Sequence, residues 1–166
     1  PRFAWLLAIL LASEARAETT PWAVFTPEDA SFQIEMPGSP ATERRERWFP
    51  ISRFVSTVYK TRRGHEVFGI NQTDLPGAVL LVVREKTILE ATRDGFLESS
   101  AAQETAFEPS FVAGQPAWEL TYAIPADEEK PEQTGRARML FVGKRLYIFY
   151  TELAATTPGA ESVRYF

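Results

Sequence analysis

The chain has 166 residues, with 18 lysines and arginines against 22 aspartates and glutamates, and it contains no cysteine. The net charge of −4 differs from the basic balance of most nucleic-acid-binding domains. Without cysteine, the chain has no thiol catalysis, no disulfide and no cysteine-ligated metal site. The length fits one domain whose core is large enough to need no disulfide.

The first 17 residues contain the three parts of a secretory signal peptide. Arg2 supplies a positive charge, residues 3–12 (FAWLLAILLA) form an apolar run, and Ala15-Arg16-Ala17 matches the A-x-A cleavage pattern. The run is about half as long as a membrane-spanning helix requires. We therefore expect cleavage between Ala17 and Glu18, a periplasmic or secreted protein, and no transmembrane segment afterwards. An uncleaved N-terminal anchor is the alternative.

Residues 18–166 are expected to form a single domain, and its first half reads as strands separated by turns. Residues 31–36 alternate cleanly, which places Phe32, Ile34 and Met36 on one face of a half-buried strand. Proline and glycine in residues 37–40 end that strand. Strands are expected at residues 22–25, 31–36, 42–48, 51–61 and 66–73, with a turn at 62–65.

The second half begins with a change of period. Apolar residues recur at helical spacing over 82–100, although residues 78–83 are equally compatible with a strand. Further strands are expected at 105–111, 117–124, 136–142 and 146–152, the last two central in the sheet because both their faces are apolar. We also expect a polar loop at 125–135 and a short helix at 160–166. We predict an α+β fold: an antiparallel sheet of about six to eight strands with helices packed against it.

Few residues have the pattern of a catalytic or metal site. His65 is the only histidine and lies in an expected turn, so a multi-histidine metal site is excluded. No G-x-S-x-G elbow and no glycine-rich phosphate loop is present. The carboxylates of the 125–135 loop lack calcium-loop spacing. We predict no catalytic, cofactor-binding or metal-binding residue, and we interpret the aromatic residues of the strongest strands as core.

One segment has an uneven charge. Residues 41–65 hold seven basic and two acidic side chains in an otherwise acidic chain. An anionic envelope component or another envelope protein could bind there. Alternation nevertheless sends Arg45 and Arg47 to one face and Arg44 to the other, so a solvated strand edge that resists aggregation is the alternative. The candidate binding residues are Arg44, Arg45, Arg47, Lys60, Arg62 and Arg63.

Five short motifs lie along the chain: residues 32–40 (FQIEMPGSP), 74–76 (DLP), 114–120 (GQPAWEL), 143–147 (GKRLY) and 162–166 (SVRYF). In this order, they resemble a group of uncharacterised exported bacterial proteins. The group looks similar in layout to the PsbP-like and DcrB-like α/β/α sandwiches, and the resemblance implies a central antiparallel sheet without established catalytic residues.

Three functions remain open from the sequence. The export signal and the missing catalytic patterns favour a non-enzymatic binding or accessory module of the cell envelope. A hydrolase of unrecognised type would require a polar pocket with converging ionisable groups. A small-ligand carrier would require an apolar cavity beside the sheet.

Overall fold

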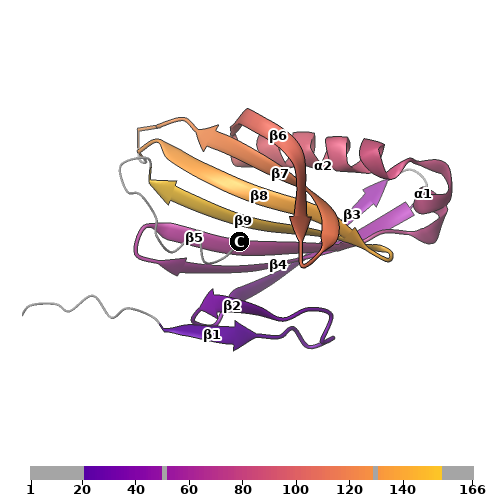
Figure 1. Cartoon of the computed structure of the whole chain (residues 1–166), viewed down its shortest axis with the longest axis horizontal. Helices are drawn as coiled ribbons and strands as arrows, with labels where there is room; N and C mark the ends of the chain where they lie inside the picture. Colours follow the sequence, from indigo (N-terminus) through magenta and orange to yellow (C-terminus); the bar gives the residue numbers. More distant parts are fainter. Residues whose placement is uncertain (1–20, 50–51, 129–130, 155–166) are drawn as a thin grey trace, which may run out of the picture.

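The structure, a computed structural model, describes residues 21–49, 52–128 and 131–154; side chains are described there except at 47–49 and 52. The expected signal peptide and the expected helix at 160–166 lie outside these residues. A short hairpin and a large sheet make up most of the described part (Figure 1).

Every strand pair in the fold is antiparallel. Strands β1 (Trp22–Phe25) and β2 (Ile34–Pro37) form the hairpin. The other seven form one sheet in the order β3-β4-β5-β9-β8-β7-β6. Their bounds are β3 (Ala41–Phe49), β4 (Ser52–Arg63), β5 (Glu66–Asp74), β6 (Gln103–Val112), β7 (Gln115–Ile124), β8 (Gln133–Val142) and β9 (Arg145–Ala154).

The alternation in the sequence sets which residues face each side of the sheet. In β7, Leu120 and Tyr122 point to one side and are fully buried, as their spacing predicts. Strand β9 is the middle strand of the seven, and both of its faces are covered, which confirms its expected central place. The expected turn at 62–65 is shorter than predicted, because β4 continues to Arg63 and only Gly64 and His65 form the turn.

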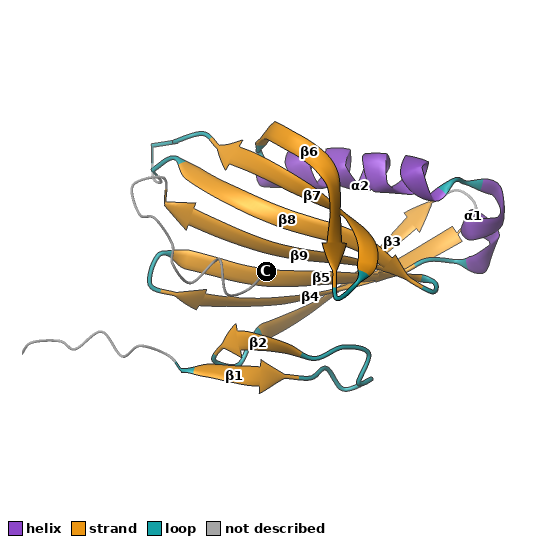
Figure 2. Ribbon diagram, in the orientation of Figure 1, coloured by secondary structure: helices purple, strands orange, loops and turns teal. Residues whose placement is uncertain are grey.

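Two helices lie between β5 and β6, where one helix or an initial strand was expected. Helix α1 (Gly77–Val82) is followed by two extended residues, Val83 and Arg84, and then by α2 (Glu85–Ser100). The prediction of a continuous helix over 82–100 is therefore wrong in its first turn, and so is the strand alternative for 78–83. Helix α2 packs against β7 on one face of the sheet through Leu89, Phe96 and Leu97 (Figure 2).

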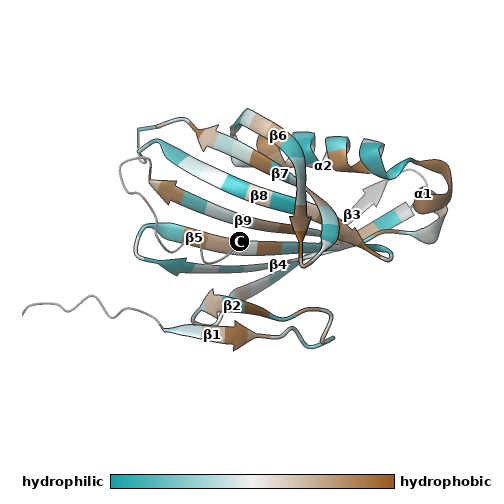
Figure 3. Cartoon of the chain, viewed as in Figure 1, coloured by the Kyte–Doolittle hydropathy of each residue, from teal (hydrophilic) through white to brown (hydrophobic). Residues whose placement is uncertain are grey.

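The β1–β2 hairpin covers part of the opposite face. Met36 of β2 is fully buried against Tyr59, Phe68 and Ile70 of the sheet. Apolar positions are visible in β1 and β2, whereas β4 is coloured mostly as polar (Figure 3). Charged groups connect the loop of the hairpin to the start of β9: Arg145 lies 2.7 Å from Asp29 of that loop and 2.7 Å from Asp74 at the end of β5.

The expected antiparallel sheet of six to eight strands, with a helix packed against it, is confirmed. The helical share is smaller than the expected α+β layout implies. Within the described residues, a helix covers one face and a strand hairpin covers part of the other, so the described fold is dominated by sheet.

Candidate binding groove

A groove of about 1180 Å³ lies on the helix-covered side of the sheet, beside the end of α2. One wall comes from β3 and β4, and the other from the last turn of α2 with the segment that follows β7. Residues of β5 and β9 lie between these walls. The residues used below are Glu43, Arg45, Lys60, Arg62, Phe96, Ser99, Ser100, Asp127, Tyr150 and Glu152.

Tyrosine rings that lie against glycines support the floor of the groove, and of the two only Tyr150 lines it. Tyr150 of β9 covers Gly69 of β5 so closely that a Cβ there would sit 2.1 Å from the tyrosine ring. Tyr122 covers Gly135 in the same way, 2.2 Å from a Cβ at that position. Phe96 of α2 packs edge-on against both tyrosine rings, at 5.2 and 5.6 Å between centroids. Each glycine therefore provides room for a ring that a side chain would displace.

Burial fixes the ionisation of the floor tyrosine. Desolvation and, to a smaller extent, the nearby Glu152 outweigh the opposite effect of Arg45 and together raise the pKa of Tyr150 to about 12. Burial likewise raises the pKa of Tyr122, whose hydroxyl donates to the Thr151 carbonyl at 3.3 Å. Both phenols are therefore neutral at physiological pH, and the charges of the groove come from its other side chains.

Three cations line the strand wall of the groove. Arg45 is held by Glu43, with its Nε 2.7 Å from a glutamate oxygen. Lys60 Nζ lies 6.0 Å from the centroid of the Tyr150 ring, within cation–π range. In the described part of the chain, neither Lys60 nor Arg62 forms an ion pair. Among the described residues, these two are therefore the cations of the wall that have no ion-pair partner.

The structure divides the six basic residues singled out in the sequence. By strand register, Arg45, Lys60 and Arg62 face the groove, whereas Arg44 and Arg63 face the opposite side of the sheet. Arg44 lies 3.9 Å from Glu46, and this carboxylate offsets the positive charge of Arg44 on that opposite face. The side chain of Arg47 lies outside the described residues. The six residues therefore do not form one patch, as the alternation already indicated.

Among the described residues, the carboxylates of the groove equal its cations in number, three against three. Glu43, Asp127 and Glu152 line the same groove, and the carbonyl end of α2 adds a partial negative charge. The groove is consequently a mixed surface in which the position of Lys60 and Arg62, more than the total charge, determines where an anion can bind.

Sequence reasoning missed most of the groove lining, including Phe96, Ile124 and Tyr150. One signal was available: Gly69 interrupts an otherwise regular strand, and a glycine inside a strand often marks the close approach of another group. The partner of that glycine depends on strand order, which the local pattern does not encode.

The other candidate residues lie apart from the groove or on the surface. His65 is exposed in the turn between β4 and β5. Across the residues with described placement, no group of three or more histidine and acidic side chains is arranged to hold a metal ion. The same residues include no helix with the length and hydropathy needed to cross a bilayer.

Comparison with known proteins adds little. No family model matches the chain, and no curated protein matches it. A solved structure of PA94 from Pseudomonas aeruginosa, a protein of unknown function suggested to be a regulator, aligns over 81% of this chain and 83% of its own. The identity is 8% and the TM-score is 0.38, a likeness that supports no conclusion about fold or function.

Proposed function

We propose that this chain is an exported, non-enzymatic binding module whose groove takes an anionic component of the cell envelope. The observation that supports it most is the placement of Lys60 and Arg62, two basic side chains without an ion-pair partner among the described residues, on the wall of a large open groove.

Strand geometry spaces these two cations for a chain of negative charges. Lys60 and Arg62 lie two positions apart on one face of β4, which separates their Cα atoms by about 6.5 to 7 Å. Walls of low dielectric strengthen the field that such cations place in a groove. An elongated ligand with repeated phosphate or carboxylate groups could contact both cations while its apolar parts lie on Tyr150.

The groove offers little for hydrolysis. Ser100 in its helical wall donates its hydroxyl to the Phe96 carbonyl at 2.8 Å, and Ser99 does the same at 3.0 Å. Burial raises the pKa of Tyr150 to about 12, which makes that phenol a weaker acid than usual. A serine nucleophile needs an adjacent base, and the groove residues include no histidine. Binding is therefore the function that the described groove residues support best.

The test compares two variants with equal loss of charge. Lys60→Gln with Arg62→Gln removes cations from the groove, and Arg44→Gln with Arg63→Gln removes two from the opposite face. Retention is measured on phosphatidylglycerol vesicles and on an anionic polymer resin. We expect the groove variant to lose retention and the control variant to keep it. The binding should also fade as salt rises, since the Debye length falls from about 10 Å at 0.1 M to about 3 Å at 1 M.

Equal retention of the two variants, or no retention of the wild type at low salt, would refute a functional anion site in the groove. Retention on vesicles alone would identify a lipid headgroup as the partner, and retention on the resin alone a soluble or wall-bound polymer.

Export rests on the N-terminal sequence pattern, and the proposed relation to uncharacterised exported proteins of PsbP-like and DcrB-like layout rests on the short motifs. We expect the protein recovered from its native envelope to begin at Glu18, because Ala15-Arg16-Ala17 satisfies the cleavage rule. N-terminal sequencing measures this directly, and a membrane-bound form that keeps residues 3–12 would contradict it.

A further inference from the structure

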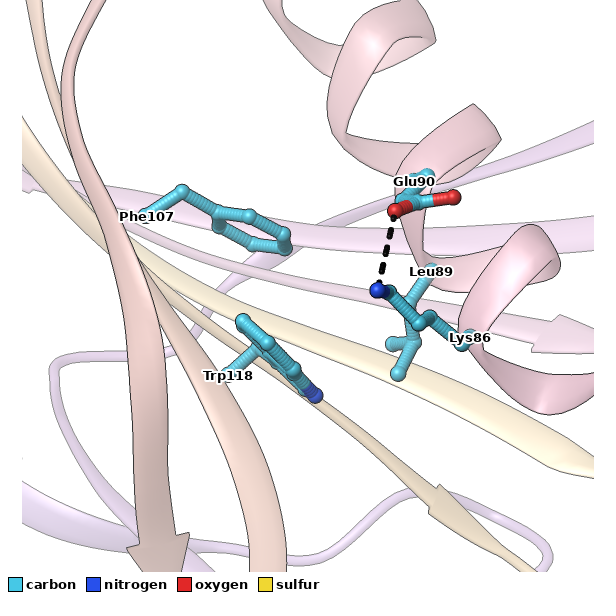
Figure 4. A pocket seen from close by; sticks show the side chains of 5 residues that line it. All are labelled: Lys86, Leu89, Glu90, Phe107 and Trp118. Atoms are coloured by element: carbon cyan, nitrogen blue, oxygen red, sulfur yellow. Dashed lines mark ion pairs between the residues drawn. The ribbon is translucent and has the colours of Figure 1, made fainter.

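A second, smaller hollow lies between the first two turns of α2 and strands β6 and β7 (Figure 4). It has a volume of about 170 Å³ and is lined by Lys86, Leu89, Glu90, Phe107 and Trp118. None of these residues lines the groove, so the two sites are distinct.

The inner walls of this pocket are apolar. Phe107 and Trp118 stack with ring centroids 4.9 Å apart and an interplanar angle of 26°. Leu89 closes the side toward the core and is only 5% exposed. The Arg93 guanidinium lies 5.0 Å from the centroid of the Phe107 ring and helps to hold that ring in place. Such walls favour a flat apolar group over water.

The charges at the mouth of the pocket cancel. Lys86 Nζ lies 3.8 Å from Glu90 Oε1, one helical turn apart (Figure 4); the Lys86 side chain is 72% exposed and that of Glu90 is 46% exposed. A ligand with a net charge of either sign would therefore meet one favourable and one unfavourable group. Among the described residues, the indole nitrogen of Trp118 has no hydrogen-bond partner. This N–H is a free donor for an acceptor atom on a ligand.

We propose that this pocket binds a small neutral aromatic alcohol or phenol. Its single ring would enter between Leu89 and the stacked rings, and its hydroxyl oxygen would accept a hydrogen bond from Trp118. The size is suitable, because a cavity of about 150 Å³ lined by apolar side chains holds benzene. The balanced mouth selects a neutral molecule over its charged analogues.

The experiment titrates three probes with the same ring and different charge: benzyl alcohol, benzoate and benzylamine. The readout is the indole N–H resonance of Trp118 in the protein spanning residues 18–166, assigned by its loss in Trp118→Phe. We expect saturable shifts with benzyl alcohol at a Kd on the order of 1 mM, as suits a ligand of so few atoms. Benzoate and benzylamine should bind about tenfold more weakly or not at all.

Two helix variants provide the matched comparison. Glu90→Phe places a ring over the pocket mouth and should weaken benzyl alcohol binding by about tenfold or more, an expected 1.4 kcal/mol. Glu98→Phe makes the same change at an exposed position of α2 that lines neither hollow, and should leave binding unchanged.

The proposal is overturned if benzyl alcohol gives no saturable shift at Trp118, or if either charged probe binds more tightly. If Glu90→Phe folds and binds like the wild type, the pocket is not the site. Should that variant fail to fold, the three-probe series on the wild-type protein still decides the matter.

Discussion

Gly69 and Gly135 each lie beneath a tyrosine of the neighbouring strand, and the two tyrosine rings meet at Phe96. Glycine thus leaves room for a tyrosine ring at two positions of the same sheet. The arrangement places the Tyr150 ring flat in the groove and keeps Lys60 within reach of its face. The floor of the groove therefore depends on the absence of a Cβ atom at Gly69.

Gly69→Ala should destabilise the protein by about 1 to 3 kcal/mol, the usual cost of overpacking. The new Cβ would lie 2.1 Å from the Tyr150 ring, so the ring must move. Gly95→Ala is the control: it lies inside α2 with nothing within 4 Å of its Cβ, and alanine there should stabilise by about 0.5 to 1 kcal/mol. Urea denaturation of both variants measures the two effects. If both shift the midpoint in the same direction, the Gly69–Tyr150 contact does not have the role assigned to it.

Glu119 is a second residue whose surroundings determine its behaviour. Its side chain is 14% exposed and lies 2.6 Å from Arg138, with Arg136 on its other oxygen. Burial favours the neutral carboxyl, but the hydrogen bonds from Arg136 and Arg138 outweigh it and hold the pKa below its usual 4.5. A carboxylate with a lowered pKa stabilises the fold above its unfolded-state pKa, and this contribution is lost as pH falls through the folded value.

Glu119→Gln should therefore cost about 1 to 3 kcal/mol at pH 7, since it removes the charged hydrogen bonds that Arg136 and Arg138 donate to this carboxylate. The difference from wild type should shrink as pH falls below 4.5, where the unfolded carboxyl takes up a proton, and should be lost once pH falls through the lower pKa of the folded state. Glu108→Gln is the control, because Glu108 lies opposite Glu119 in the register but is exposed. Denaturation midpoints at neutral and acid pH test this, and a difference that grows toward low pH would contradict the sign.

Among the elements, the β1–β2 hairpin packs on the face of the sheet opposite helix α2. Phe32, just before β2, contacts Phe25 of the hairpin and three aromatic residues of the sheet, including Tyr59 and Tyr147 at 5.8 Å. These edge-on ring contacts connect the hairpin to strands β4 and β9. Packing, together with the ion pair between Arg145 and Asp29, therefore holds an element that shares no hydrogen-bonded ladder with the main sheet.

Phe32→Ala should lower the free energy of unfolding by about 2 to 4 kcal/mol, in line with truncation of a packed aromatic ring. Val24→Ala removes an apolar side chain from the same hairpin, but Val24 is 64% exposed and should cost less than about 0.5 kcal/mol. Guanidinium denaturation compares the two. A Phe32 variant as stable as the Val24 variant would show that the hairpin is not held by this cluster.

Much of the element order could be predicted from the sequence, because strand alternation is a local signal. The faces of residues 31–36 and of β7 follow directly from their period of two. The break at Val83 and Arg84 could not be predicted, since neither residue is a glycine or proline and the apolar spacing continues across it. The groove could not be predicted either: it depends on β5 lying beside β9, a pairing of strands about 80 residues apart in sequence.

The whole molecule presents two different surfaces on one sheet. One face is shared by α2, the small aromatic pocket and the groove, and the other by the β1–β2 hairpin and the Glu119 cluster. The basic side chains of β3 and β4 divide between these faces, so a test of function must separate them. An anion site in the groove would engage Lys60 and Arg62 and leave Arg44 and Arg63 untouched.

The most direct measurement is the mapping of backbone amide and side-chain N–H chemical shifts while a short linear polyphosphate is added at low salt. We expect the largest shifts at Lys60, Arg62 and Tyr150, with smaller ones in the last turn of α2, and their disappearance near 1 M salt. The guanidinium resonances of Arg44 and Arg63, whose side chains face the other side of the sheet, should not shift. Shifts centred on Arg44 and Arg63 or on Arg136 and Arg138, or no shifts at low salt, would contradict the claim that the groove is the binding site.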